Sequence, residues 1–405
     1  MFELQSLGPA IAEDEVQQTY PLQYLYVNNS YKTKFESFNP ENKEVFLIGR
    51  TGCGKSALLE MVRQKAKKKD NSRVVSIGHQ SAKIEHDLTF SLPDLLDLSS
   101  VNSVPSQLRP LVFKSLWKYL IMINILRRIY DNDIKKFFRI LEQNETVYRF
   151  LEKYGGLNEQ LTIVDQVFSF LDELDRSLLG GFSNKSDIEK RKYAKYIYDL
   201  YLELEKIENT EFSQEIKGKF IYMLFDDLDY RWAPDQRNKD LIRYLFETIN
   251  LMNRKFSGRI RFIVALRTDI FRQLEFHQVE KIKPYVLEMR WDWQFILEII
   301  KKRMSIIWNV RHLDPLQKFF PPEINGVPLS KYLTRRTLRR PRDIINFVNK
   351  IVEESSNFKR YGNQIPVFMI ENAEKRYSRE RMDALCDEWK FVYPNVRKWI
   401  NRFAG

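Results

Sequence analysis

The chain has 405 residues, of which 43% are hydrophobic and 30% are charged. This length can bury a large core and predicts two or three packed units rather than one. The two cysteines, Cys53 and Cys386, are far apart in sequence and offer neither a disulfide framework nor a thiolate metal cluster, and four scattered histidines argue against a histidine metal site. The net charge of +12 permits attraction to nucleic acid, but much of the excess is spread over segments that also carry Asp and Glu.

Two features argue against a secreted or membrane-bound protein. Residues 1–15 are mildly acidic and lack the basic-then-apolar order of a signal peptide. The most apolar stretch, residues 116–126, is interrupted by Lys118 and Asn124 and is too short to span a bilayer. We therefore expect a soluble, cytoplasmic protein without a membrane anchor.

A phosphate-loop pattern follows the first predicted strand. The apolar run at residues 45–48 is typical of a buried strand, and residues 49–56 then read G-x-x-x-x-G-K-S. A helix is predicted over residues 55–69 and a second strand over residues 73–77. This order of strand, loop, helix and strand is the opening of a parallel α/β sheet.

Each residue type in this loop suits phosphate binding. We expect Gly49, Gly52 and Gly54 to take φ > 0 and to bring backbone N–H groups close to phosphate oxygens. Lys55 is expected to bind the β and γ phosphates and Ser56 to bind Mg²⁺, while the positive end of the following helix favours the anion. The residues expected to hold ATP and Mg²⁺ are Gly49, Arg50, Thr51, Gly52, Cys53, Gly54, Lys55, Ser56 and Ala57.

The chain changes character between residues 105 and 217, where helical periodicity replaces the α/β pattern. The α/β pattern resumes with an apolar run at residues 220–225, and a further buried strand is predicted at residues 261–266, after a helix at residues 239–253. From residue 293 onward the pattern is helical to the end, with a Pro-rich break at residues 320–322. The amphipathic runs of the helical region are residues 111–128, 134–151, 161–178 and 188–207.

These patterns predict an α/β fold, namely a parallel P-loop NTPase sheet with a large helical insertion and a C-terminal helical lid domain. The N-terminal segment and the first part of the sheet domain are expected at residues 1–104, and the insertion at residues 105–217. The second part of the sheet domain is expected at residues 218–292, and the lid domain at residues 293–405.

Acidic residues follow the predicted strand at residues 220–225 directly. Asp226, at the carboxyl end of that strand, would emerge beside the phosphate loop and hold Mg²⁺, and Asp227 could orient or deprotonate the attacking water. The alternative is an acidic turn that caps the next helix. Asp229 either supports the metal site or pairs with Arg231.

Arginines in two places are candidates for contact with the γ phosphate. Arg267 ends the strand at residues 261–266 and so lies on the loop's edge of a parallel sheet, although it could instead pair with Asp269 or with the acidic cluster. Arg342 lies in an arginine-rich segment that opens a helix at residues 344–352. An arginine of this segment could close over the nucleotide, bind nucleic acid or serve a neighbouring subunit. The segment contains Arg335, Arg336, Arg339, Arg340 and Arg342.

In its order of motifs the chain resembles the KAP and STAND branches of P-loop ATPases, which are close to the AAA+ and origin-recognition ATPases. The resemblance rests on residues 49–56, the inserted helical region, Asp-Asp-Leu-Asp at residues 226–229, Arg267 and Arg-Pro-Arg-Asp at residues 340–343. It implies ATP hydrolysis, oligomer formation and, in bacteria, frequent service in antiphage defence beside a nuclease or other effector. By this resemblance Lys55 and Ser56 bind phosphate and Mg²⁺, Asp226 binds Mg²⁺, Asp227 polarises water, and Arg267 and Arg342 act as sensors.

The chain departs from these families in three respects. KAP proteins often carry membrane-spanning helices in the insertion, whereas this insertion is too charged for them. Asp227 stands where AAA+ proteins usually have Glu, and its shorter side chain favours slow, switch-like turnover. STAND proteins usually carry a long repeat sensor, for which this chain has no room, so sensing or effector action is expected from a partner chain.

The sequence therefore predicts an ATPase that couples nucleotide state to oligomer assembly or effector control, in antiphage defence. A DNA-directed motor, loader or repair ATPase is one alternative, and a nucleotide-dependent scaffold without hydrolysis is another. The expected ligands and partners are ATP, Mg²⁺, further copies of the chain and a separate effector protein such as a nuclease, with nucleic acid left open.

Overall fold

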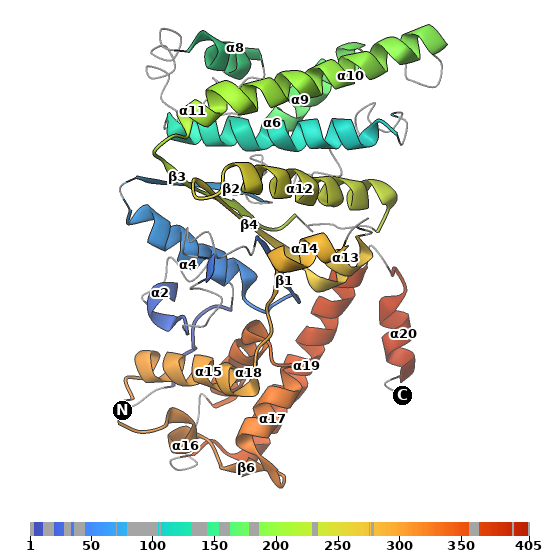
Figure 1. Cartoon of the computed structure of the whole chain (residues 1–405). Coiled ribbons are helices and arrows are strands. Elements are labelled where there is room, and N and C mark those ends of the chain that lie inside the picture. Colours follow the sequence, from blue (N-terminus) through green and yellow to red (C-terminus); the bar gives the residue numbers. More distant parts are fainter. Residues whose placement is uncertain are drawn as a thin grey trace. The chain divides into compact units, whose positions relative to one another are not determined.

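The structure is a computed structural model (Figure 1), and its described residues fall into two compact units. The loop unit comprises Met1–Lys34, Ile48–Val62 and Glu288–Gly405, and the sheet unit comprises Phe35–Leu47 and Arg63–Leu287. The described residues are 4–10, 20–27, 34–35, 45–69, 71–78, 104, 107–130, 144–153, 163–177, 186–228, 234–274, 276, 279–310, 312–355, 364–390 and 393–403.

A five-stranded parallel sheet has the strand order β2-β3-β4-β1-β5. Its strands are β1 (Phe46–Gly49), β2 (Ser72–Ile77), β3 (Phe220–Phe225), β4 (Ile260–Arg267) and β5 (Val286–Glu288). The four predicted strands are confirmed to within one residue at each end. The sequence did not predict β5, because a three-residue strand carries too little pattern to be recognised.

The central strands are buried almost throughout, as parallel strands covered on both faces require. In β3 every residue after Phe220 is buried, and in β4 every residue before Arg267 is buried. The register places Phe225 of β3 opposite Ile77 of β2 and Val264 of β4. The carboxyl ends of β3 and β4 therefore lie at the same edge of the sheet.

Helix α6 (Arg109–Ile129) is the centre of the inserted helical region. It contacts β2, α9 (Ile163–Ser177), α10 (Asp187–Ile207) and α12 (Gln236–Lys255), and Figure 1 shows it between α10 and α12. A helix packed on several sides must be apolar around most of its circumference, which explains the unusually hydrophobic sequence of α6. Trp117 Nε1 donates to Leu241 O at 2.9 Å and ties α6 to α12.

The predicted helices of the insertion are confirmed where the structure describes them. Helices α6, α9 and α10 match three of the four amphipathic runs, and α8 (Glu145–Lys153) matches the end of the fourth. Residues 134–143 of that run lie outside the described residues. Ser186 and Glu189 form a capping box that begins α10. No helix in the described parts of the chain combines the length and the apolar character needed to cross a bilayer.

The shorter elements of the sheet unit surround this core. The π-helical turn η3 (Glu208–Phe212) and α11 (Ser213–Glu215) connect α10 to β3. Helix α13 (Thr268–Gln273) follows β4, and α14 (Val279–Ile282) and the 3-10 turn η4 (Lys283–Tyr285) lead to β5.

The C-terminal helices form the hydrophobic core of the loop unit. Residues near the N-terminus bind to them: Arg303 Nη1 donates to Leu7 O at 2.9 Å, and Trp308 Nε1 donates to Gln5 O at 2.7 Å. The loop unit contains the N-terminal helix α2 (Leu22–Leu25) and the C-terminal helices α15 (Trp293–Ile307), α16 (Pro315–Phe319), α17 (Leu329–Arg336), α18 (Pro341–Glu354), α19 (Val367–Trp389) and α20 (Val396–Phe403).

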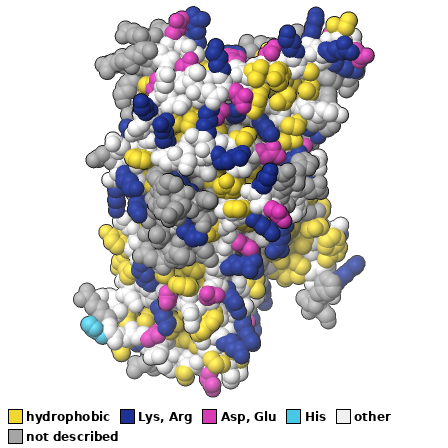
Figure 2. Space-filling view, viewed as in Figure 1, with side chains coloured by type: hydrophobic (Ala, Val, Ile, Leu, Met, Phe, Trp, Pro, Cys, Tyr) yellow, Lys and Arg dark blue, Asp and Glu magenta, His cyan; other side chains and the backbone are white. Residues whose placement is uncertain are grey.

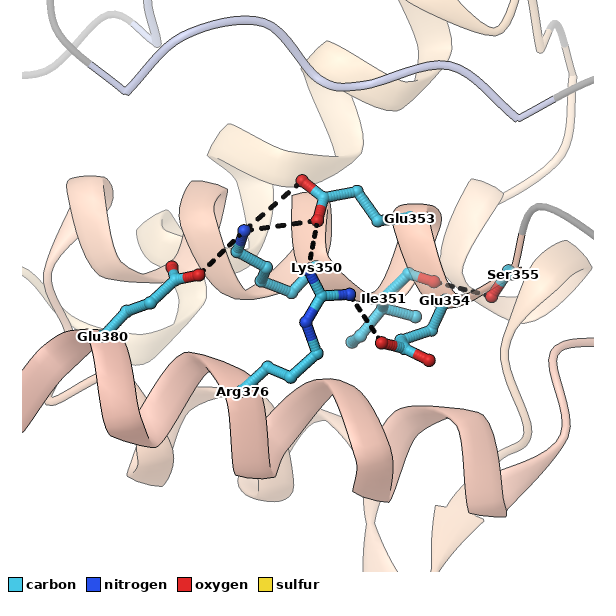
Figure 3. A network of polar contacts seen from close by, with 7 residues as sticks. All are labelled: Lys350, Ile351, Glu353, Glu354, Ser355, Arg376 and Glu380. Atoms are coloured by element: carbon cyan, nitrogen blue, oxygen red, sulfur yellow. Dashed lines mark hydrogen bonds and ion pairs between the residues drawn. The ribbon is translucent and has the colours of Figure 1, made fainter.

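Helices α18 and α19 are joined by the ion-pair network drawn in Figure 3. Lys350 Nζ lies 3.0 Å from Glu380 Oε1 and 3.2 Å from Glu353 Oε2. Arg376 reaches Glu353 at 3.1 Å and Glu354 at 2.6 Å. Because Lys350, Glu353 and Glu354 lie on α18 and the other two residues on α19, the network fixes the two helices against each other on their exposed side.

The prediction of helices from residue 293 to the end is wrong at one place. A short antiparallel hairpin, β6 (Glu323–Ile324) and β7 (Val327–Pro328), interrupts them. Asn325 and Gly326 both have positive φ, at 50° and 74°. An Asn-Gly pair in this conformation forms the two-residue turn that suits a hairpin, so local turn chemistry overrides the helical pattern here.

A buried ion pair in the sheet unit should contribute strongly to stability. Lys118 of α6 lies 2.7 Å from Glu208, and both side chains are at most 5% exposed. Replacing Lys118 with Ala leaves a buried carboxylate short of a partner, so we expect urea denaturation to give a free energy of unfolding lower by about 3 kcal/mol.

The control is the exposed pair Lys153–Glu203, whose atoms are 3.2 Å apart and whose side chains are 35% and 46% exposed. Lys153→Ala should cost less than about 1 kcal/mol. Equal losses for the two variants would show that burial of the Lys118 pair does not matter.

Candidate functional site

The loop at residues 49–56 connects β1 to α4 (Lys55–Lys67). Gly52 and Gly54 have φ of +77° and +94°, as predicted. The prediction for Gly49 is wrong, because Gly49 does not take a positive φ. A Cβ on Gly49 would lie 2.4 Å from Cys53 Sγ, so glycine is required there by close approach.

Three backbone carbonyls of the loop accept hydrogen bonds from donors within the loop and the helix that follows it. Lys55 Nζ donates to Gly49 O at 3.0 Å and to Arg50 O at 3.3 Å. The N–H of Cys53 also donates to Arg50 O, at 3.2 Å, and the N–H of Leu58 donates to Gly54 O at 3.0 Å within the first turn of α4. The carbonyls of Gly49, Arg50 and Gly54 thus have donors from inside the loop and its helix.

The three carbonyls in between accept hydrogen bonds from residues far away in sequence. Arg340 Nη1 donates to Thr51 O at 3.4 Å, the Arg342 N–H to Gly52 O at 3.2 Å, and Trp291 Nε1 to Cys53 O at 2.7 Å. All of these residues belong to the loop unit. With every carbonyl from residue 49 to residue 54 engaged, the groups that the loop has left to offer a ligand are N–H donors, which suit an anion.

The structure brings Arg342, one of the predicted site residues, against the loop. Its Cβ lies 3.1 Å from the position that a Cβ on Gly52 would take. Helix α18 begins at Pro341 without a side-chain cap, and its first-turn Arg342 N–H uses Gly52 O as acceptor instead. Within the described part of the chain, the buried Nε of Arg342 has no hydrogen-bond partner. A guanidinium with an unused N–H beside this loop can donate a hydrogen bond to an anionic oxygen.

A buried carboxylate supports the arginines from behind. The Asp343 side chain is 2% exposed and lies 3.6 Å from Arg340 Nε and 3.4 Å from Arg381 Nε. Burial raises the pKa of Asp343, and the neighbouring arginines oppose this shift without cancelling it. Burial also lowers the pKa of Arg340. The ion pair with Asp343 therefore holds the Arg340 guanidinium in a partly desolvated position next to the loop.

Two further side chains complete the surroundings of the loop. Thr51 Oγ1 donates to Glu388 Oε1 of α19 at 2.7 Å. Burial raises the pKa of the Cys53 thiol, and this side chain, which is 4% exposed, packs beside Gly49. The sequence analysis did not identify Glu388 or Trp291, because both lie more than 200 residues from the loop and neither belongs to a recognisable motif.

Asp226 and Asp227 lie in the sheet unit, at the end of β3. The Asp226 N–H donates to Ile77 O at 3.0 Å and extends the pairing of β3 with β2. Asp227 has φ of +51°, and its N–H donates to Asp226 Oδ1 at 3.1 Å. Gly78 is in close contact here, since a Cβ on it would lie 2.7 Å from Asp226 O. The chain thus turns sharply at the end of β3 and leaves Asp227 exposed.

Arg267 ends β4 at the same sheet edge as Asp226. Its guanidinium binds the Asp269 carboxylate with both arms, at 3.1 Å from Nε and 2.7 Å from Nη2. The ion pair with Asp269, which the sequence left open as an alternative, is therefore present. Asp229 and Arg231 lie outside the described residues.

The fold and the loop define an α/β protein with a five-stranded parallel sheet and a C-terminal helical domain. Residues 294–386 match the FunZ-associated C-terminal helical domain. The matched region runs from α15 into α19 and contains Arg340 and Arg342, but not the loop. No curated protein is significantly similar to the chain. The resemblance to the KAP and STAND branches stays a prediction.

Gly52 should be sensitive to an added methyl group for two reasons, its backbone conformation and its close neighbour. Gly52→Ala would place a β-substituted residue at φ +77° and push its Cβ against Arg342. We expect this variant to lower the free energy of unfolding by about 2 kcal/mol in urea, from backbone strain and overpacking together.

Gly218→Ala is the matched control, because Gly218 has φ of +74° and nothing lies within 4 Å of the added Cβ. Backbone strain alone should cost about 1 kcal/mol. If the two variants lost the same stability, the close approach of Arg342 to Gly52 would carry no weight.

Proposed function

We propose that this chain binds ATP with Mg²⁺ at residues 49–57 and hydrolyses it, and that its nucleotide state controls assembly or an effector. Lys55 contacts the β and γ phosphates, and the hydroxyl of Ser56 binds the metal ion. Arg342 contacts the γ phosphate from the start of α18. The class of protein proposed is a P-loop ATPase related to the AAA+ and STAND groups.

The observation that carries the proposal is the state of the loop's backbone. Each carbonyl from Gly49 to Gly54 accepts a hydrogen bond from the protein, so its oxygen is not directed at a ligand. Lys55 stands at the first residue of α4, where the partial positive charge of the helix end adds to its own. Donors and positive charge without exposed acceptors are what a phosphate chain needs.

The carboxylates after β3 supply the metal and water chemistry in this proposal. Asp226 holds Mg²⁺ in this proposal, and Asp227 orients or deprotonates the attacking water. The short side chain of Asp227 favours slow turnover, which suits a switch better than a motor. Arg267, whose guanidinium pairs with Asp269, contacts the γ phosphate in this proposal.

The match of residues 294–386 supports a role in defence, because FunZ is a defence-associated gene. Arginines of the matched helices lie against the loop, so the domain is suited to report whether nucleotide is bound. The proposed partners are further copies of the chain and a separate effector such as a nuclease. Co-purification in the presence of ATP tests this part, and a failure to recover any nucleotide-dependent partner would remove it.

Hydrolysis at this site should depend on Lys55 and Asp227. With ATP and Mg²⁺, we expect Lys55→Ala to lose both tight ATP binding and phosphate release, because the principal cation on the β and γ phosphates is gone. Asp227→Asn should keep ATP binding and lower phosphate release at least about a hundredfold, within the range attributed to a general base.

The matched controls replace exposed residues of the same two types. Lys65→Ala changes an exposed lysine of α4, the helix that begins at Lys55, and Asp187→Asn changes an aspartate whose side chain is 92% exposed. Equal phosphate release from all five proteins would rule out catalysis here, and ATP binding without release from the wild type would favour the scaffold. Light scattering of the same samples tests assembly, which a monomer at every concentration would contradict.

A DNA-directed ATPase is the second candidate. The observation that favours it is the basic segment around α17, where Arg335 and Arg339 are exposed, together with the net charge of +12. Figure 2 shows Lys and Arg spread over the viewed face among acidic and hydrophobic side chains. DNA binding that weakens steeply with salt, and ATPase stimulation by DNA, would favour this candidate.

A further inference from the structure

We propose that Trp291 and Arg340 are positioning residues that shape the phosphate loop and thereby set the affinity for ATP. The proposal rests on the proposed function, and it names a control of that same site. Three consecutive loop carbonyls, those of Thr51, Gly52 and Cys53, accept hydrogen bonds from Arg340, Arg342 and Trp291 respectively. We call these three donors the carbonyl clamp.

The clamp acts through the geometry of the peptide bond. In a trans peptide the C=O of one residue and the N–H of the next point in opposite directions. A donor that fixes the Cys53 carbonyl therefore turns the Gly54 N–H away from Trp291, and a donor on the Thr51 carbonyl does the same for the Gly52 N–H. These two N–H groups are then directed together to the other side of the loop, where an anion can receive them.

The flexible backbone of the loop makes an external clamp necessary. Gly52 and Gly54 both adopt left-handed conformations, but a glycine populates many others at little cost. Without the clamp, ordering of these glycines would have to accompany nucleotide binding and would reduce the affinity. With it, the loop is ordered before the nucleotide arrives.

The residues that carry the clamp are themselves fixed. Trp291 packs against the hydrophobic core of the C-terminal helices. The link between α17 and α18 contains two successive non-glycine residues with positive φ, Leu338 at 50° and Arg339 at 55°, a strained conformation that must be held by its surroundings. Asp343 then holds Arg340 from the first turn of α18.

The clamp places the control of ATP affinity in the C-terminal helices. Arg340 and Arg342 lie inside the region that matches the FunZ-associated domain, and Trp291 lies just before it. A shift of these helices would withdraw all three donors at once, so any partner that moves them would change how tightly ATP is held. The contribution of Trp291 should be the larger, because its bond is 2.7 Å long and that of Arg340 is 3.4 Å.

The test compares ATP affinity in variants that lose a clamp donor. Trp291→Phe keeps an aromatic ring and removes the indole N–H, and we expect its Kd for ATP by calorimetry to rise about fivefold, the value of one net hydrogen bond. Arg340→Met should raise the Kd about twofold, in keeping with its longer bond. The loop binds ground state and transition state alike, so kcat at saturating ATP should change less than the Kd.

Each variant has a matched control in the same unit. Trp308→Phe removes an indole donor whose bond to Gln5 O is also 2.7 Å long, away from the loop. Arg397→Met removes a guanidinium of the same unit whose ion pair with Asp383 is more than half exposed. Both controls should bind ATP as the wild type does. A rise of the Kd in all four variants would mean that the loop responds to general loss of stability, and would overturn the clamp.

Hydrogen exchange without nucleotide separates this proposal from the proposed function. Amides of the peptide covering residues 49–56 should exchange faster in Trp291→Phe and Arg340→Met than in the wild type and the two controls. If the wild type binds no ATP, the proposed function fails, whereas the exchange rates still decide the clamp. Unchanged exchange in Trp291→Phe overturns it.

Discussion

The need to satisfy six consecutive backbone carbonyls is the constraint on which the rest of the candidate site depends. A glycine-rich loop has little side-chain structure of its own, so its shape is decided by where its carbonyl oxygens find donors. Lys55, Cys53 and Leu58 supply donors from within, and Arg340, Arg342 and Trp291 supply them from outside. The result is a loop that turns its acceptors toward the protein and keeps N–H donors for a ligand.

The external donors make the C-terminal helices part of the candidate site. Helix α18 gains an acceptor for an otherwise unsatisfied N–H, and the loop gains a fixed position for the Gly52 carbonyl, so each element stabilises the other. Asp343 neutralises part of the charge that the arginines gather there. The helical domain, whose residues donate to three carbonyls of the loop, therefore takes part in fixing the shape of the loop.

In the sheet unit, too, charged side chains are paired with partners inside the protein. Helix α6 is buried on several sides, and its Lys118 meets Glu208 where the helix packs against the end of α10. At the edge of the sheet, Asp226 follows β3 and Arg267 ends the neighbouring strand β4, where it pairs with Asp269. Lys118 and Glu208 in the sheet unit, and Asp343 and Arg381 in the loop unit, are thus paired across elements that are far apart in sequence.

The sequence by itself determined the four longer strands, the insertion helices and the loop, because buried strands read as apolar runs and phosphate loops have a fixed spacing. It also placed Asp226, Asp227 and Arg267 after their strands, and Arg342 at a helix start. Only the tertiary structure decided that Gly49 packs closely against Cys53 and that Asp269 forms an ion pair with Arg267. It also decided that Trp291, Arg340 and Glu388 contact the loop. The contacts of Trp291, Arg340 and Glu388 with the loop join residues hundreds of positions apart, and no local periodicity or spacing records which distant side chain will meet the loop.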